Sequence, residues 1–490
     1  MQSNQYNLTV IGSGPGGRSA AIAAAGMHKR VALVTPQTTA RDGLPPNRTV
    51  GPKLFRDAIR ACPGCSSTGV PEDRGAARSR ITMDELQRRL VVLRDRERKA
   101  ATHRLQHSGV EVLIGAPRFV GPHRIEVRQS RTRRTITSDY VLVATDTVPS
   151  RRGHVPFDGK CICDTDEILR LDALPNSLIV VGAGVIGIEY ATLFATLGVD
   201  VVVVDMRTRL LDAWDQEIVD SLLHVSRARG MGFRLGEEVI GVDRIGADRA
   251  AVELADEERL TADVVLFATG HLGDTNTLNL QAAGLDADDR GRLWCHEDQQ
   301  SWVPHIYGVG DVVGFPQQRV DEREQGLRAV CAAFREPFRA DTQRGYELFT
   351  IPEIAMLGHS SEQLTDWDVA FEVGVAQLRS SAHGPKDAET GGLLKLFFQR
   401  ASRQLMGIHC SGDRAAEIVN NARGVMAVAG TIDDLCQEPT NDRSIAESYQ
   451  AAVADGLNRL AGIPIKRLYS RAEHRSGANR QPTSGAATTR

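Results

Sequence analysis

Two segments of the chain share one order of apolar and polar positions: a short apolar run, a glycine-rich turn, and then a helix pattern. In the first segment the run Leu8–Ile11 precedes the turn Gly12–Gly17, and an alanine-rich helix is expected over Arg18–Gly26. Another apolar run, Arg30–Val34, follows the helix. This order predicts a strand–helix–strand unit close to the N-terminus.

The second segment repeats this design more than a hundred residues later. The run Leu178–Val181 leads into the turn Gly182–Gly187, a helix expected over Ile188–Leu197, and the valine-rich run Val199–Val204, which ends in Asp205. Continuous apolar runs of this kind are typical of parallel strands that are covered on both faces. Both units are therefore predicted to lie in doubly wound α/β sheets.

The last third of the chain has a different pattern. Strands are expected over Leu393–Phe398 and Leu405–Cys410, followed by helices over Arg414–Ala429 and Ile445–Leu460, which together indicate an α+β domain. The final residues, Arg467–Arg490, have almost no apolar side chains and are expected to be disordered.

A long helix is expected between the two glycine turns, over Met83–Gln106. It carries many arginines among leucines and valines. A nucleic-acid surface is one interpretation, and a solvated face of an amphipathic helix is the other. The formal net charge of −3 at pH 7 gives no broad basic field, which favours the second interpretation and small soluble partners over nucleic acid or membrane.

Composition and the N-terminus place the protein in a reducing compartment. Apolar residues make up 41% and charged residues 25% of the 490 residues, as in soluble globular proteins. The start of the chain lacks the pattern of a signal peptide, and no apolar stretch is long enough for a membrane span. The 8 cysteines are too sparse for a disulfide scaffold. We expect a cytoplasmic protein with mostly free, packed thiols.

The two glycine turns have the spacing that binds a dinucleotide. The first glycine permits a tight turn, the second lets the backbone approach a diphosphate, and the third lets helix and strand pack closely. One such turn is weak evidence, but two turns that each join a strand to a helix are strong evidence. Two turns without a ligand are the alternative. The predicted cofactor-binding glycines are Gly12, Gly14 and Gly17 in the first turn and Gly182, Gly184 and Gly187 in the second.

The residue at the end of the strand after each helix should contact the adenosine ribose. Asp205 holds this position in the second unit and favours NAD, whereas Arg207 and Arg209 could meet the 2′-phosphate of NADP. Ordinary surface arginines are the alternative. In the first unit the position holds Thr35, whose hydroxyl is a weaker partner.

Three further turns follow short apolar runs. In Ile306–Val312, Gly310 and Asp311 form a Gly-Asp corner that can bind the ribityl chain of a flavin, although an ordinary turn is equally consistent. A second run, Val264–Phe267, ends at Gly270, whereas the similar Tyr140–Thr145 ends in Asp146 rather than glycine.

Taken together, these motifs resemble the flavin-dependent disulfide reductase superfamily and, within it, the soluble pyridine nucleotide transhydrogenases. The likeness runs from about Leu8 to Leu460. It includes the two turns and the Gly-Asp corner, and it extends to Tyr346–Ile354, Leu405–Cys410 and the segment from Ala446 through Asp455–Leu460.

The resemblance implies two Rossmann-like domains, for FAD and NAD(P), and a C-terminal α+β dimerisation domain. It places the FAD domain at 1–150 and 271–345, the NAD(P) domain at 151–270 and the dimerisation domain at 346–465, before a tail at 466–490. It implies FAD, NAD and NADP as cofactors and nicotinamide nucleotides as partners of a homodimer.

The departures from the superfamily concern thiol chemistry. Its redox cysteine pair is replaced here by Leu44 and Thr49, and the transhydrogenases likewise have a Thr at the second position. Without a thiolate pair, a reduced flavin has no dithiol to reduce, and another nicotinamide is the expected acceptor. Cys62 and Cys65 have redox spacing but follow the flavin-facing Lys53 too distantly, and Cys161 and Cys163 are interpreted as structural.

The acid-base residues that the resemblance implies follow the same trend. The His-Pro pair of disulfide reductases is replaced by Asp442 and Arg443, and the following acid is retained as Glu447. Lys53 is expected near the flavin, with Glu189 as a possible ion-pair partner that tunes the ring. We therefore assign Lys53, Glu189 and Glu447 as candidate catalytic residues, and Thr49 and Lys53 also as flavin contacts.

Two alternatives to a transhydrogenase remain open at this point. A relative that has lost FAD would explain why Thr35, Arg41, Asp42, Asp146 and Gln318-Arg319 all depart around one ligand. A lipoamide-type dehydrogenase would fit the overall likeness but not the missing cysteines.

Overall fold

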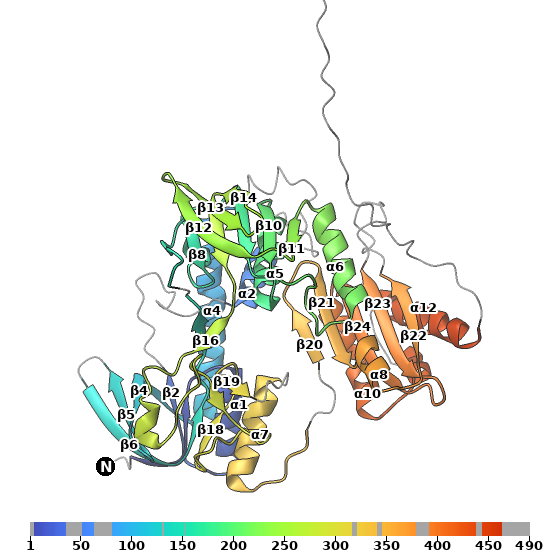
Figure 1. Cartoon of the computed structure of the whole chain (residues 1–490). Coiled ribbons are helices and arrows are strands. Elements are labelled where there is room, and N and C mark those ends of the chain that lie inside the picture. The colour runs from blue at the N-terminus through green and yellow to red at the C-terminus, as the bar shows by residue number, and fades with distance from the viewer. Residues whose placement is uncertain are drawn as a thin grey trace, which may run out of the picture.

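The computed structural model describes residues 4–35, 51–62, 81–129, 132–151, 153–315, 321–340, 345–378, 392–437 and 443–462. Two parallel sheets and a C-terminal antiparallel sheet, each covered by helices, make up most of the described chain (Figure 1). The α/β fold class with two Rossmann-like units is confirmed. Several residues singled out above lie outside the described residues: Arg41, Asp42, Leu44, Thr49, Cys65, Gln318, Arg319, Asp442 and the tail 466–490.

The first parallel sheet is built around β1 (Gln5–Ile11), which pairs with β2 (Val31–Thr35) on one side and β6 (Thr132–Val143) on the other. The edges are β3 (Glu111–Ile114), beside β2, and the late strand β18 (Ile306–Gly308), beside β6. Because these strands are parallel, their carboxyl ends meet at one edge of the sheet, where ligands of open α/β sheets bind.

Helices α1 (Pro15–Gly26) and α7 (Glu322–Phe334) pack against each other beside this sheet (Figure 1). The other half of β6 continues into an antiparallel ribbon with β5 (Arg124–Gln129) and β4 (Ala116–Gly121). The buried alanines of α1 allow its close approach to the sheet.

The expected long helix is α4 (Met83–His107). Its charged side chains pair one turn apart, with Arg89 Nε 2.7 Å from Glu85 and Lys99 Nζ 2.6 Å from Asp95. Such pairs are typical of a solvated helix face, which supports that interpretation over a nucleic-acid surface.

The second parallel sheet has the order β11-β10-β9-β15-β8. Its strands are β8 (Ile162–Asp164), β9 (Ser177–Val181), β10 (Asp200–Asp205), β11 (Gly232–Leu235) and β15 (Val264–Phe267). Most residues of β9, β10 and β15 are buried, as their continuous apolar runs predict.

Helix α5 (Val185–Thr196) covers this sheet and is buried along most of its length. Helix α6 (Gln216–Ala228) lies between the second parallel sheet and the C-terminal sheet, where it contacts β24 (Leu405–Gly412) (Figure 1). An antiparallel sheet of β12 (Val239–Ile245), β13 (Arg249–Leu254) and β14 (Arg259–Ala262) is attached to the second unit.

The chain passes between the two parallel sheets along a pair of antiparallel strands, β7 (Thr147–Pro149) and β16 (His271–Gly273). The carboxyl ends of β6 and β15 lead into these two strands. The smaller elements around the parallel sheets are α2 (Pro52–Arg60), η1 (Ile168–Arg170), η2 (Leu280–Ala283), β17 (Leu293–Trp294) and β19 (Val313–Phe315).

The C-terminal sheet is antiparallel, with the order β20-β21-β24-β23-β22. Its strands are β20 (Gly345–Leu348), β21 (Glu353–Gly358), β22 (Phe371–Gln377), β23 (Leu393–Gln399) and β24 (Leu405–Gly412). Its helices are α8 (Ser361–Asp366), α9 (Ala415–Asn421), α10 (Arg423–Ala427), α11 (Ile432–Gln437) and α12 (Arg443–Leu460).

One expected helix is wrong in extent. The segment Arg414–Ala429 was expected to be a single helix, but it forms α9 and α10, which are separated at Ala422. The break follows Asn420-Asn421 and precedes Gly424, residue types with low helix propensity. Among the described residues, no helix has the length and apolar character needed to cross a bilayer.

Candidate functional site

The first glycines of the two turns have the same geometry. Gly12 has φ 112° and Gly182 has φ 105°, a region that disfavours side chains. A Cβ on Gly12 would stand 2.0 Å from the carbonyl oxygen of Ala144, and one on Gly182 would stand 2.6 Å from that of Ala268. Each turn therefore packs against the end of the neighbouring strand so closely that only glycine fits.

The third glycines hold helix and strand together. A Cβ on Gly17 would stand 2.6 Å from the carbonyl oxygen of Gly12, and one on Gly187 would stand 1.9 Å from that of Gly182. These contacts are the close helix–strand packing that the dinucleotide turn requires.

The middle glycines lie where the helices begin. Gly14 is the N-cap of α1 and Gly184 the N-cap of α5, and neither helix has a side-chain cap. A Cβ on Gly184 would meet none of the described residues within 4 Å, so a ligand has room to approach this backbone. Uncapped helix N-termini are suited to bind the charge of a diphosphate.

Carboxylates surround the first turn. The Cβ position of Gly14 lies 3.5 Å from Asp146 Oδ1 and 3.8 Å from Glu322 Oε2. Thr35, at the end of β2, has its hydroxyl 3.1 Å from that of Ser13 in the same turn. Asp146 was noticed in the sequence as a departure, whereas Glu322 was not.

The Gly-Asp corner lies beside this turn. Gly310 has φ 80° and donates its N–H to Gln325 Oε1 of α7 at 2.7 Å. Partial desolvation raises the pKa of Asp311, His271 opposes this rise, and Asp146 adds to it. Asp311 therefore lies close enough to interact electrostatically with Asp146, which precedes β7, and with His271 of β16.

The position predicted to bind the ribose in the second unit holds an internal ion pair between Asp205 and Arg207. Asp205 accepts hydrogen bonds from Arg207 Nε at 2.9 Å, Arg207 Nη2 at 2.7 Å and the backbone N–H of Ala183 at 2.6 Å. Burial raises the pKa of Asp205, but these bonds lower it by more, so the pKa lies below its usual range. Arg207 remains about half exposed, with 47% of its side chain accessible.

The suggested pairing of Lys53 with Glu189 is wrong. Lys53 is exposed on α2, and no ion pair joins it to Glu189 within the described residues. Glu189 instead accepts the backbone N–H of Phe349 at 2.7 Å. The apolar side of α2 is what faces α5, because the Phe55 ring packs against Tyr190, and this turns Lys53 outwards.

Glu189 lies at the junction of the second unit with the C-terminal sheet. Burial raises the pKa of this carboxyl to about 7, opposed by the Phe349 N–H and by Arg56. Arg56 itself is bonded to Glu353 of β21 at 2.8 Å, and Arg60 reaches the same carboxylate at 2.8 Å. Sequence reasoning missed these arginines, since nothing in their local pattern distinguishes them from surface charges.

Gly270 lies beside the second turn, because it follows Ala268 and Thr269, which contact Gly182. It has φ 120°, and no described residue comes within 4 Å of its Cβ position, as expected of a turn that approaches a ligand. Glu447 is exposed on α12 of the C-terminal domain. Cys62, Cys161 and Cys163 are buried, as expected of structural thiols.

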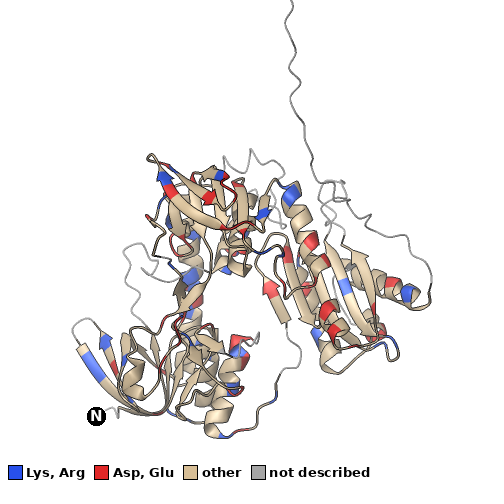
Figure 2. Ribbon diagram, viewed as in Figure 1, with Lys and Arg blue, Asp and Glu red and all other residues tan. Residues whose placement is uncertain are grey.

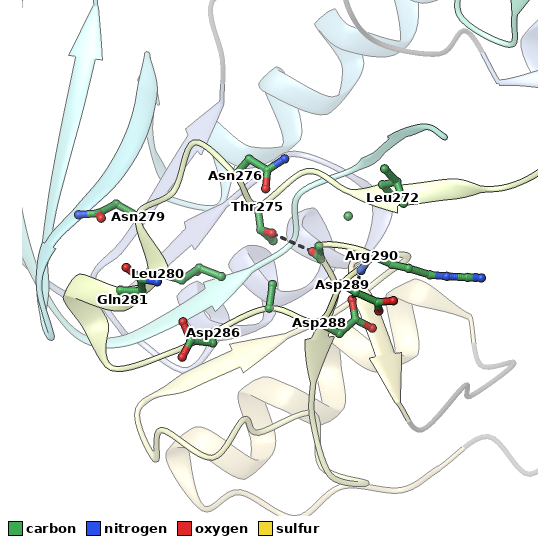
Figure 3. A pocket seen from close by; sticks show the side chains of 13 residues that line it. Leu272, Thr275, Asn276, Asn279, Leu280, Gln281, Asp286, Asp288, Asp289 and Arg290 are labelled. Atoms are coloured by element: carbon green, nitrogen blue, oxygen red, sulfur yellow. Dashed lines mark hydrogen bonds between the residues drawn. The ribbon is translucent and has the colours of Figure 1, made fainter. Parts of the chain in front are cut away.

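A surface hollow of about 420 Å³ lies beside β16 and η2 (Figure 3). Asp288 in its wall holds its own turn by accepting the backbone N–H groups of Arg290 and Arg292 at 2.9 and 2.8 Å. Thr275 Oγ1 donates to the carbonyl of Gly291 at 2.8 Å (Figure 3). None of the predicted site residues that the structure describes lines this hollow, and we assign it no role.

The two turns fit dinucleotides in shape. Both place an uncapped helix N-terminus next to glycines where a diphosphate can approach, and the open space at Gly184 is the direct evidence for the second turn. The first turn differs in charge, because two carboxylates face it. Nucleotide binding at each turn, with a polyol or ribose contact at the adjacent strand end, is the chemistry that this arrangement supports.

Comparison with known proteins identifies the family. The family described as "Pyridine nucleotide-disulphide oxidoreductase" matches residues 6–335, and its dimerisation domain matches residues 346–453. The soluble pyridine nucleotide transhydrogenase of Mycobacterium tuberculosis is 36% identical over 462 residues, covering 94% of this chain and 98% of that protein. The transhydrogenase of Chromohalobacter salexigens is 34% identical and covers 94% of this chain and 100% of its own length.

Solved structures agree with this fold. LpdA from Mycobacterium tuberculosis superposes with a TM-score of 0.78 at 25% identity, over 91% of this chain and 99% of that one. The flavoprotein disulfide reductase RclA from Escherichia coli, at 20% identity and a TM-score of 0.73, covers 92% of this chain and 99% of its own and shares the fold. The resemblance seen in the sequence is confirmed: the chain belongs to the pyridine nucleotide-disulphide oxidoreductases, a family that binds FAD and NAD(P), and among them to the soluble pyridine nucleotide transhydrogenases.

Proposed function

We propose that the protein transfers hydride between NADPH and NAD⁺ and uses no redox disulfide. Two dinucleotide turns in one chain, combined with Leu44 and Thr49 at the positions of the redox cysteines, carry this proposal. FAD, when bound at the first turn, would supply the hydride-transfer chemistry that links the two nicotinamides. The degenerate, flavin-free alternative is not favoured, since the relatives named as transhydrogenases match along the whole fold.

The residues of the chain bind and orient the nucleotides. Gly12, Gly14 and Gly17 at α1 are assigned to FAD, and Gly182, Gly184 and Gly187 at α5 to NAD(P). Asp311 and Gly310 are assigned to the ribityl chain, and Thr35 and Asp205 to the two adenosine riboses. Gly270 is assigned to nucleotide binding at the turn where the chain leaves the second sheet for the first. Thr49, Lys53, Glu189 and Glu447 keep their assignments as predictions. Hydride transfer itself requires two aligned rings and no proton shuttle.

The domains are proposed to follow the sheets. Residues 1–150 and 271–345 form the FAD domain, 151–270 the NAD(P) domain and 346–465 the dimerisation domain. The family match to a dimerisation domain at residues 346–453 supports a homodimer. Sedimentation should therefore give a dimer at micromolar concentration, because obligate interfaces of this kind are large and apolar. A stable monomer would contradict this assignment.

Thiol-independent turnover is the test of the proposed function. NADPH should reduce a thio-nicotinamide analogue of NAD⁺, whereas lipoamide and glutathione disulfide should not be reduced. Replacing Cys62 and Cys65 together by Ser should leave the rate within about twofold, because no thiolate takes part in hydride transfer. Disulfide reduction that disappears in the double variant would overturn the proposal. FAD-loaded protein without turnover on any acceptor would also overturn it.

A further inference from the structure

Glu322 stands at the entrance to the first turn. It is the first residue of α7, and its backbone carbonyl oxygen lies 2.8 Å from the Cβ position of Gly16, so the starts of α7 and α1 are in contact. Its side chain lies between Gly14 of the first turn and Gly310 of the Gly-Asp corner. Oε2 lies 3.8 Å from the Cβ position of Gly14 and 3.5 Å from that of Gly310.

The carboxylate of Glu322 occupies the position of an anion. It lies at the start of α1, where the backbone N–H of Gly16 stabilises the ionised carboxylate and opposes the rise of its pKa. The free N–H groups of a helix N-terminus are what a phosphate binds, so this side chain stands where a diphosphate would compete with it. The sequence gives no indication of this contact, because an acid in the first turn of a helix normally interacts with the N-terminus of its own helix.

Most of the charges facing Glu322 are negative. Asp146, after β6, Asp311, after β18, and the adjacent Asp321 surround it, whereas Arg18 of α1 and the adjacent Arg323 are the cations nearby. The acidic start of α7 is visible in Figure 2. Burial, and then Asp311 and Asp146, raise the pKa of Glu322 to about 7.

We propose that Glu322 sets the affinity of the protein for FAD, because its carboxylate holds the anion position that the diphosphate needs, and that FAD binding takes up a proton at this residue. The inference rests on the proposed function only in taking the first turn as the FAD site. It assigns a positioning role to a residue that none of the sequence motifs includes.

The sign of the pH effect follows from the charges. A diphosphate next to Glu322 disfavours the ionised carboxylate, so FAD prefers the protonated side chain. Below about pH 7 most sites are already protonated and binding costs little. At higher pH a proton must be taken up, and for full linkage of one proton the affinity falls about tenfold per pH unit.

Titration of the flavin-free protein with FAD, followed by quenching of flavin fluorescence at about pH 6 and about pH 8.5, tests the inference. The wild-type dissociation constant should rise at least about tenfold between these values. Glu322→Gln, which keeps the shape of the side chain, should bind FAD more tightly at the higher pH and show a flat profile. Glu322→Ala should behave in the same way.

Glu324→Gln is the matched control. Glu324 lies two residues further along the same helix and pairs with Arg328 at 3.2 Å, so its replacement changes the net charge equally without changing the glycine turn. This variant should keep the wild-type pH profile. Identical FAD affinities of wild type and both Glu322 variants at both pH values would overturn the inference, even where hydride transfer is found. FAD binding as described without hydride transfer would instead overturn only the proposed function.

Discussion

Replacement of Lys395 by Met is expected to destabilise the protein by about 3 to 5 kcal/mol. Lys395 Nζ lies 2.8 and 2.7 Å from the two oxygens of Asp215, and only 4% and 1% of the two side chains are exposed. Asp215 begins α6 and Lys395 lies in β23, so the pair joins the second unit to the C-terminal sheet. Without the ammonium, a carboxylate remains buried without its cation, which is the costly outcome.

Thermal unfolding measures this effect. For a domain of about 150 to 250 residues, a loss of this size corresponds to a fall in Tm of about 6 to 20 °C. Lys99→Met is the matched control, since Lys99 pairs with Asp95 at 2.6 Å on an exposed helix face and should change stability by less than about 1 kcal/mol. Equal shifts in the two variants would contradict the assignment. Adding Asp215→Asn to Lys395→Met should recover part of the loss, because the uncompensated charge is removed.

The same pair predicts a pH dependence. Burial raises the pKa of Asp215, but Lys395, together with His409 and Ser361, lowers it by more, so the folded-state pKa lies below the unfolded value. A carboxyl of this kind contributes stability above its unfolded pKa of about 4 and loses it as the pH falls through the lower folded value. The difference in Tm between wild type and Lys395→Met should therefore be largest near neutral pH and shrink in acid.

The two nucleotide-binding units could be predicted from the sequence because each is local. A strand, a glycine turn and a helix follow one another within about 30 residues, and the steric need for glycine at Gly12 and Gly182 arises from backbone contacts of that same fold. The segment Arg414–Ala429 was less predictable. Its apolar spacing suits a helix, and the break at Ala422 depends on three weak helix formers whose combined effect a pattern does not reveal.

The residues around the turns depend on tertiary packing and were predicted less well. Glu322 is more than 300 residues from Gly14 in the sequence and meets it only because α7 packs on α1. Lys53 was expected to face Glu189, but the apolar residues of α2 determine how that helix rotates against α5. Asp205 and Arg207 were both recognised, yet the sequence does not tell that their side chains bind each other before any nucleotide arrives.

If the second turn binds NAD(P) as proposed, the Asp205–Arg207 pair gives this site two ways to bind a ribose. An unmodified 2′-hydroxyl can be bound by the Asp205 carboxylate if the guanidinium moves away, whereas a 2′-phosphate can be bound by Arg207 if it leaves the carboxylate. The half-exposed guanidinium has room for either movement, since 47% of its side chain is accessible. A protein that exchanges hydride between NADP(H) and NAD(H) at one site requires such tolerance.

Arg207→Ala should therefore separate the two nucleotides. NADP(H) binding should weaken by about 1 to 3 kcal/mol, because a charge-assisted contact to the phosphate is lost. NAD(H) binding should stay unchanged or tighten, since Asp205 no longer has to release a guanidinium. Direct binding of NADPH and NADH, measured by their fluorescence, gives both dissociation constants. Arg209→Ala tests the second candidate for the 2′-phosphate separately, because it removes the same charge two residues further on. Equal losses for both nucleotides in Arg207→Ala would show that Arg207 does not select the nucleotide.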